Sequence, residues 1–254
     1  MAWNEFTGIM KRRLLVNWRV DPEAMRRVLP PGVTPKLVNG SAIAGLCLVA
    51  LQRLRPRGVP EFLGIASENL AVRTGVVTRS RMGVDGAVLI FDRYSGSRVN
   101  AALGHLVGYG IHERGRFHVA ENRLLTEISI RALAGSAIAH VRLAPTHALA
   151  TESIFGSVEQ ASDFFRGGEC GYSPTPRPGI WDCVRLHLER WDFEPMRVLS
   201  ASSTHIVRLF GGAASIDSAF VMRDIPHTWT PCGQEELGAP SVSGPALRSR
   251  GLAA

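Results

Sequence analysis

The chain has 254 residues, of which 45% are hydrophobic and 20% charged, and its formal net charge is +7. Its apolar runs are strand-length, well short of the roughly 18 to 20 residues of a membrane span, so we expect no membrane partner. The basic clusters are short and lack the aromatic interleaving of nucleic-acid-binding surfaces, so we also expect no nucleic-acid partner.

Only two of the 29 basic residues are lysines, Lys11 and Lys36. A codon bias toward arginine is sufficient to explain this composition. Its chemical consequence holds whatever the cause, because lysine is the basic side chain that forms a Schiff base with a carbonyl substrate. The chain therefore has few ways to carry out amine catalysis.

The first half of the sequence predicts strands and one short helix. A strand over 14–18 ends at Asp21-Pro22-Glu23, where Asp suits a helix N-cap and Pro the first helical position. A helix over 24–29 follows and ends at Pro30-Pro31-Gly32. Apolar runs bounded in several places by Gly, Pro or Asn then predict strands at 33–38, 42–51, 70–78 and 87–92.

The second half continues in the same way. A helix is expected over 98–107, and a capping box beginning at Ser157 predicts a second one ending near Phe165. Three prolines predict an extended loop over 171–179. Strands are expected at 109–112, 116–120, 124–131, 137–143, 184–189, 196–202 and 215–223. The pattern favours one mainly β domain over 1–233, a barrel or a sandwich, with a disordered tail over 234–254.

The segment Trp18-Arg19-Val20-Asp21-Pro22-Glu23, with Leu29-Pro30 after it, resembles the opening of the acetoacetate decarboxylase-like superfamily. Segments 67–74, 164–167, 171–174 and 221–227 are similar to an uncharacterised branch of it, domain of unknown function 2071. The resemblance spans roughly residues 14–229. It implies a closed or double β-barrel with a few short peripheral helices and an internal ligand cavity.

In that superfamily an Arg on the first strand, a Glu on a central strand and two adjacent lysines form the site, and the first lysine makes the Schiff base. By position, the resemblance places the Arg at Arg19 and the Glu at Glu68. The lysine element falls nearest to residues 108–112, so Ile111 and His112 stand where the lysines would be. Schiff-base decarboxylation of acetoacetate is therefore not expected.

The remaining candidates come from the residues near these positions. Acid–base chemistry would fall to Glu68 with a nearby His105, His112 or Tyr109. Arg19 and Arg73 would bind a carboxylate, because a guanidinium can hold it bidentately. Other candidates for the cavity wall come from the branch-specific segments: Tyr172, Arg223 and His227. Each also has an ordinary interpretation as a core or surface residue.

Three functional hypotheses remain open. The first is an enzyme that uses acid–base chemistry, such as enolisation, dehydration, isomerisation or cyclisation, on a carbonyl-, carboxylate- or polyketide-like substrate. The second is a non-catalytic small-ligand-binding barrel, and the third is a structural or interaction protein with a filled barrel. The scattered cysteines supply no metal-ligand spacing, so we expect no metal and no cofactor. An N-terminus without an apolar signal core predicts a cytoplasmic protein, and the resemblance is compatible with a homo-oligomer.

Overall fold

The computed structural model describes residues 5–80, 83–103 and 108–238. Thirteen strands form one continuous sheet in this part of the chain. The strands are β1 (Phe6–Val20), β2 (Thr34–Pro35), β3 (Leu37–Val38), β4 (Ser41–Pro56), β5 (Ile65–Ser80), β6 (Gly83–Ser95), β7 (Glu113–Glu121), β8 (Thr126–Ala132), β9 (Ala137–Pro145), β10 (Cys170–Pro174), β11 (Ile180–Leu188), β12 (Glu194–Ser203) and β13 (Ala214–Glu236). The helices are α1 (Pro22–Val28), α2 (Arg98–Leu103), α3 (Val158–Arg166) and α4 (Thr204–Phe210), with 3-10 turns η1 (Glu61–Leu63) and η3 (Gly211–Ala213).

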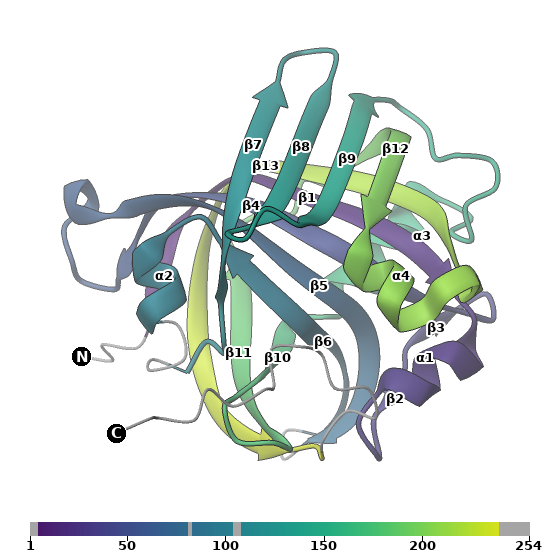
Figure 1. The fold of residues 1–254 in the computed structure, drawn as a ribbon, viewed down its shortest axis with the longest axis horizontal. Helices are drawn as coiled ribbons and strands as arrows, with labels where there is room; N and C mark the ends of the chain where they lie inside the picture. The colour runs from purple at the N-terminus through teal and green to yellow at the C-terminus, as the bar shows by residue number, and fades with distance from the viewer. Residues whose placement is uncertain (1–4, 81–82, 104–107, 239–254) are drawn as a thin grey trace.

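The sheet closes on itself twice. Among the described residues, strands β1, β4, β5, β6, β10, β11 and β13 pair in a closed ring, here called the first barrel. Strands β7, β8, β9 and β12 link β6 back to β13. Together with β13, β1, β4, β5 and β6, which belong to both barrels and are called the shared strands, they form a second barrel. Figure 1 shows β7, β8 and β9 standing above the first barrel. The predicted double β-barrel with short helices is confirmed.

The shared strands are buried on both faces, which explains their nearly unbroken apolar sequences. Side chains on one face, such as Leu14, Leu46 and Val72, pack in a core that includes Ile128 and Val141 of the second barrel. Alternate side chains project into the first barrel. There Leu15 and Ile43 join an aromatic cluster that contains Phe155, Phe164, Phe165, Trp191, Phe193 and Phe220.

Local sequence signals set several element boundaries as expected. The Asp21 carboxylate accepts a hydrogen bond from the Ala24 amide at 2.9 Å, and Pro22 opens α1. Ser157 caps α3 in the same way, accepting from the Gln160 amide at 3.1 Å. These two helices form where the capping residues predict them.

Several elements differ from the sequence predictions. The expected strand at 109–112 is a turn, because Gly108 and Gly110 take φ values of 81° and 77°. The expected loop at 171–179 begins as β10, and α4, capped by Ser203, was not foreseen. β13 continues to Glu236, which pairs with Ile180, so the strand extends past the expected boundary at residue 233. Residues 104–107 of the helix expected over 98–107, and residues 239–254 of the expected tail, lie outside the described residues.

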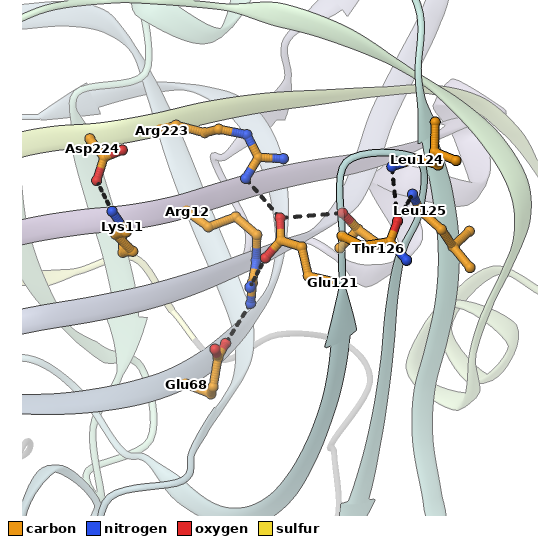
Figure 2. Close-up of polar contacts among 10 residues, drawn as sticks. Lys11, Arg12, Glu68, Glu121, Leu124, Leu125, Thr126, Arg223 and Asp224 are labelled. Atoms are coloured by element: carbon orange, nitrogen blue, oxygen red, sulfur yellow. Dashed lines mark hydrogen bonds and ion pairs between the residues drawn. The ribbon is translucent and has the colours of Figure 1, made fainter.

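A four-residue ion network joins the two barrels, and Figure 2 shows it. Arg12 of β1, only 4% exposed, donates to Glu68 of β5 at 2.7 Å and to Glu121 of β7 at 2.8 Å. Arg223 of β13 donates to the other oxygen of Glu121 at 2.7 Å. Two guanidiniums thus face two carboxylates, and the network carries no net charge.

The two carboxylates of this network respond to it in opposite ways. Burial raises the pKa of Glu68 by more than the neighbouring Arg12 lowers it. Burial also acts to raise the pKa of Glu121, but hydrogen bonds from Arg223 and Arg12 outweigh it, so this pKa lies below its usual value. The ionised form of Glu121 therefore stabilises the fold, whereas ionisation of Glu68 disfavours it.

Phe220 is expected to be a main source of stability. It is fully buried and stacks on Phe193 with ring centroids 4.3 Å apart, so Phe220→Ala should cost about 3–5 kcal/mol of unfolding free energy. Phe62→Ala makes the same change at a side chain that is 84% exposed, and should alter stability by less than about 0.5 kcal/mol. Urea denaturation of both variants measures this, and equal losses would contradict the packing described.

The ion network predicts a pH-dependent difference between two conservative variants. At neutral pH, Glu121→Gln should destabilise the protein by about 1–3 kcal/mol, and Glu68→Gln by less. A lowered pKa gives stability that is present above the unfolded value of about 4.3 and is lost as pH falls through the folded value. The gap between wild type and Glu121→Gln should therefore close below about pH 4. Denaturation between pH 3 and 7 tests this, and a constant gap would refute it.

Candidate functional site

A cavity of about 400 Å³ lies inside the first barrel. Each of the seven strands of this barrel contributes at least one residue to its wall. The wall is mainly apolar, and its polar lining residues include Arg13, Arg55, Asn69, Arg73, Arg93, Asn100, Tyr109, His112 and Glu169. Leu63 and Val99, which are 58% and 51% exposed, also line the cavity and indicate where it meets solvent. The volume is in the usual range for small-molecule sites.

Strand register brings the polar residues of the wall together. Cys47 of β4 pairs with Ala71 of β5, which in turn pairs with Arg93 of β6. The small Ala71 side chain leaves room for Arg93 and Cys47 to approach each other across it. In the next inward row Arg73 lies opposite Gly45, where a Cβ would meet the Val16 carbonyl oxygen at 2.6 Å. The long Arg73 side chain therefore lies beside Gly45, which has no side chain.

Arg73 is a buried cation with incomplete hydrogen bonding. It is 4% exposed, donates to the Asn17 side-chain oxygen at 3.1 Å and lies 4.9 Å from the Phe165 ring centroid. Its Nε has no hydrogen-bond partner. Burial lowers the pKa of Arg73 to about 10, with a smaller contribution in the same direction from Arg13 and an opposite one from Cys47. The group is still charged at neutral pH.

Arg93 and Arg13 add further positive charge to the same wall. Arg93 donates from Nε to the Ser173 hydroxyl at 3.0 Å, and burial lowers its pKa to about 10. Arg13 contacts the Met222 sulfur at 3.8 Å, and its Nε also lacks a partner. Within the described part of the chain, none of these three arginines forms an ion pair with a carboxylate, in contrast to Arg12 and Arg223.

His112 and Tyr109 bring proton-transferring groups to the cavity. The Nδ1 atom of His112 lies 3.1 Å from the Gly110 carbonyl oxygen, so the tautomer protonated at Nδ1 makes Nε2 the basic nitrogen. The Tyr109 hydroxyl donates to the Trp229 carbonyl at 3.0 Å, and burial raises the pKa of this phenol. Tyr109 therefore remains protonated at neutral pH.

The structure separates the residues expected from the sequence into two groups. Arg73, Tyr109 and His112 line the cavity together. Glu68 does not, because the side chains that alternate into the first barrel are those of Asn69, Ala71 and Arg73. Glu68 instead pairs with Arg12, and Arg223 pairs with Glu121 (Figure 2).

Of the other expected residues, Arg19, Tyr172 and His227 also lie away from the cavity wall. Arg19 donates to the Ser215 hydroxyl at 2.9 Å and to the Glu152 carbonyl at 3.0 Å. Tyr172 is buried in the core on the opposite face from the lining residue Gly171. His227 is 1% exposed and packs against Trp229, and burial lowers its pKa to about 4. His105 lies outside the described residues.

Sequence reasoning missed the cavity residues Arg13, Cys47, Asn69 and Arg93. The available signal was a charged residue inside an apolar strand, as at Arg93. It was ambiguous, because a strand buried on both faces gives no indication of which face borders a cavity.

Both lysines of the chain lie away from the cavity wall. Lys11 pairs with Asp224 at 2.6 Å on the surface, and Lys36 donates to the Phe164 carbonyl at 2.9 Å. Since the sequence contains no other lysine, no primary side-chain amine lines this cavity.

In residues 5–80, 83–103 and 108–238, no group of three or more His, Cys, Asp or Glu side chains is arranged to hold a metal ion. The helices of these segments are all too short or too polar to cross a membrane.

Solved structures with a similar fold are acetoacetate decarboxylase-like. Acetoacetate decarboxylase from Legionella pneumophila has a TM-score of 0.62 at 11% identity, over 94% of this chain and 87% of that one. An acetoacetate decarboxylase-like enzyme from Sphingomonas wittichii has a TM-score of 0.59 at 14% identity, over 92% and 93%. The enduracididine biosynthesis enzyme MppR has a TM-score of 0.57 at 14% identity, over 94% and 90%. At these identities the likeness shows the fold alone.

No curated protein matches the chain. One family does match it, DUF2071, described as an uncharacterised conserved protein, over residues 9–208. This region contains most of β1, all of β4, β5 and β6, and most of the cavity wall. The chain therefore belongs to the DUF2071 family and has the acetoacetate decarboxylase-like fold.

Proposed function

We propose that this protein is an enzyme that binds a small organic carboxylate in the first-barrel cavity and transfers protons on it without a Schiff base. The observation that carries this proposal is the set of guanidiniums of Arg13, Arg73 and Arg93, which line one cavity without a carboxylate partner in the described residues.

The charge of these arginines indicates an anionic ligand. A buried cation is costly unless a counter-ion compensates it, and a planar guanidinium holds a carboxylate through two parallel hydrogen bonds. The rest of the wall, including Val49, Leu51 and Leu186, offers apolar contacts to a hydrocarbon body. An organic acid with a compact apolar group matches both parts of the wall.

Proton transfer would fall to His112 and Tyr109. With the carboxylate held by Arg73 and Arg93, His112 can accept a proton from an acidic carbon of the ligand. Tyr109, kept protonated by its burial, would exchange its hydrogen bond to the Trp229 carbonyl for one to the developing negative charge. Enolisation of this kind is the first step of several isomerisations, dehydrations and cyclisations, so it is the most general reaction to test.

The positions of the lysines support chemistry that needs no amine. Lys11 and Lys36 hold partners away from the cavity wall. One MppR structure is described as a complex with pyruvate, which makes 2-oxo acids a reasonable choice of test ligand. Phenylpyruvate combines a 2-oxo acid with a compact apolar group.

One observation favours a second candidate, a non-catalytic carboxylate-binding protein. Glu68, the expected general base, lies outside the cavity in the ion network with Arg12. Binding would then need only the arginines. The two candidates differ in whether His112 matters for turnover.

The first test is ligand affinity. Arg73→Met and Arg93→Met should each raise the Kd for phenylpyruvate about tenfold or more in isothermal titration calorimetry, because each removes a charged partner of the carboxylate. Arg19→Met is the matched control, since Arg19 makes its hydrogen bonds outside the cavity. The neutral analogue phenylacetone should bind weakly to all four proteins. Wild-type affinity in both cavity variants would contradict the proposal.

The second test is enolisation. In deuterated buffer near neutral pH, wild-type protein should accelerate loss of the C3 proton signal of phenylpyruvate, measured by NMR. His112→Ala should lower the enzymatic rate about a hundredfold while changing the Kd little, because it removes the base and leaves the arginines in place. Binding without any acceleration by wild-type protein would favour the non-catalytic candidate.

A further inference from the structure

Of the four cysteines, only Cys47 lines the cavity. Its neighbours in β4, Leu46 and Leu48, are fully buried on the opposite face, whereas Cys47 is partly exposed. Its strand partners Leu15 and Ala71 face the first barrel as well. The thiol is therefore directed into the space that a ligand would occupy.

The thiol and the arginines belong to one cluster. Cys47, Arg73 and Arg93 line the same cavity, and strand register places Cys47 and Arg93 on either side of Ala71. Arg73 is itself more than nine-tenths buried and has an unpartnered Nε at the same cavity wall. A carboxylate held by these guanidiniums would therefore lie in the same space as the thiol.

The other three cysteines do not line the cavity. Cys183 is buried in the core with Tyr172, and Cys170 lies beside it on the neighbouring strand. Cys232 is exposed. Cys170 also has an arginine beside it, and hydrogen bonds from Cys183 and Arg185 lower the pKa of its thiol to about 6, but Cys170 does not line the cavity.

We propose that Cys47 is a nucleophile for an electrophilic carboxylate, of the α,β-unsaturated acid class, whose carboxylate is held by Arg73 and Arg93. The inference rests on the carboxylate site of the proposed function and names the chemistry that this site allows. The thiolate electron pair forms a carbon–sulfur bond at the β-carbon, and the carbon–carbon π pair moves to the α-carbon. The thiol releases its proton to solvent as this bond forms, and a proton from water neutralises that carbon.

A pair of alkylating reagents tests the inference on the full-length protein. Iodoacetate carries a carboxylate, whereas iodoacetamide is its neutral counterpart of nearly equal size. Both react by forming a carbon–sulfur bond as the carbon–iodine bond breaks and iodide leaves with the electron pair. If the arginines guide the reagent, the ratio of iodoacetate to iodoacetamide rates should be about tenfold or more higher at Cys47 than at Cys232. Peptide mapping by mass spectrometry gives both rates from one sample.

Variants separate guidance by the arginines from simple exposure. Arg73→Met and Arg93→Met should bring the rate ratio at Cys47 down to that at Cys232, while Arg19→Met should leave it unchanged. Incubation with acrylate should add one acrylate mass to wild-type protein and none to Cys47→Ser at the peptide containing residue 47. Each variant is first checked for a wild-type circular dichroism spectrum.

Two results would overturn the inference: no alkylation of Cys47 by either reagent, or the same rate ratio at Cys47 and Cys232. Titration of Cys47→Ser with phenylacetate, which is not an electrophile, keeps this failure distinct from failure of the proposed function. Binding of phenylacetate without selective alkylation refutes the nucleophile alone. Absence of any carboxylate binding refutes the proposed function as well.

Discussion

Side chains alternate in direction along strands that are buried on both faces, and the rest of this structure depends on that constraint. β1, β4 and β5 serve as walls of two barrels, so each successive side chain enters a different interior. Arg12 and Arg13 are neighbours in the sequence, yet Arg12 joins the ion network between the barrels and Arg13 lines the cavity. A shift of one residue in register would exchange the two environments.

The two groups of arginines show how charge compensation separates structural from functional residues. Arg12 and Arg223 are matched by Glu68 and Glu121, and this network is complete without any ligand (Figure 2). The cavity arginines Arg73 and Arg93 donate hydrogen bonds to neutral partners, and among the described residues neither forms an ion pair with a carboxylate. A buried charge without a counter-ion opposes folding. We therefore attribute the buried arginines of the cavity to a ligand that supplies the anion.

The sequence predicted the fold better than the site, and the reasons are physical. Helix caps at Asp21 and Ser157 act locally, so they could be identified without the fold. The turn at Gly108 and Gly110 was mistaken for a strand because apolar residues surround two glycines whose positive φ values are visible only in the structure. Glu68 was placed at the site by the family resemblance, but the direction of its side chain depends on which face of the strand borders the cavity. Arg93 and Cys47 come together only through the register of three strands.

The central claim is that Arg73 and Arg93 together hold the carboxylate of a ligand inside the first barrel. A crystal structure of the protein soaked with 4-bromobenzoate tests this most directly, because anomalous scattering locates the bromine independently of the carboxylate. The account predicts the carboxylate within hydrogen-bond distance of both guanidiniums and the bromine among the apolar residues of the same cavity. A bound molecule whose carboxylate points to solvent, or one located outside the first barrel, would contradict it.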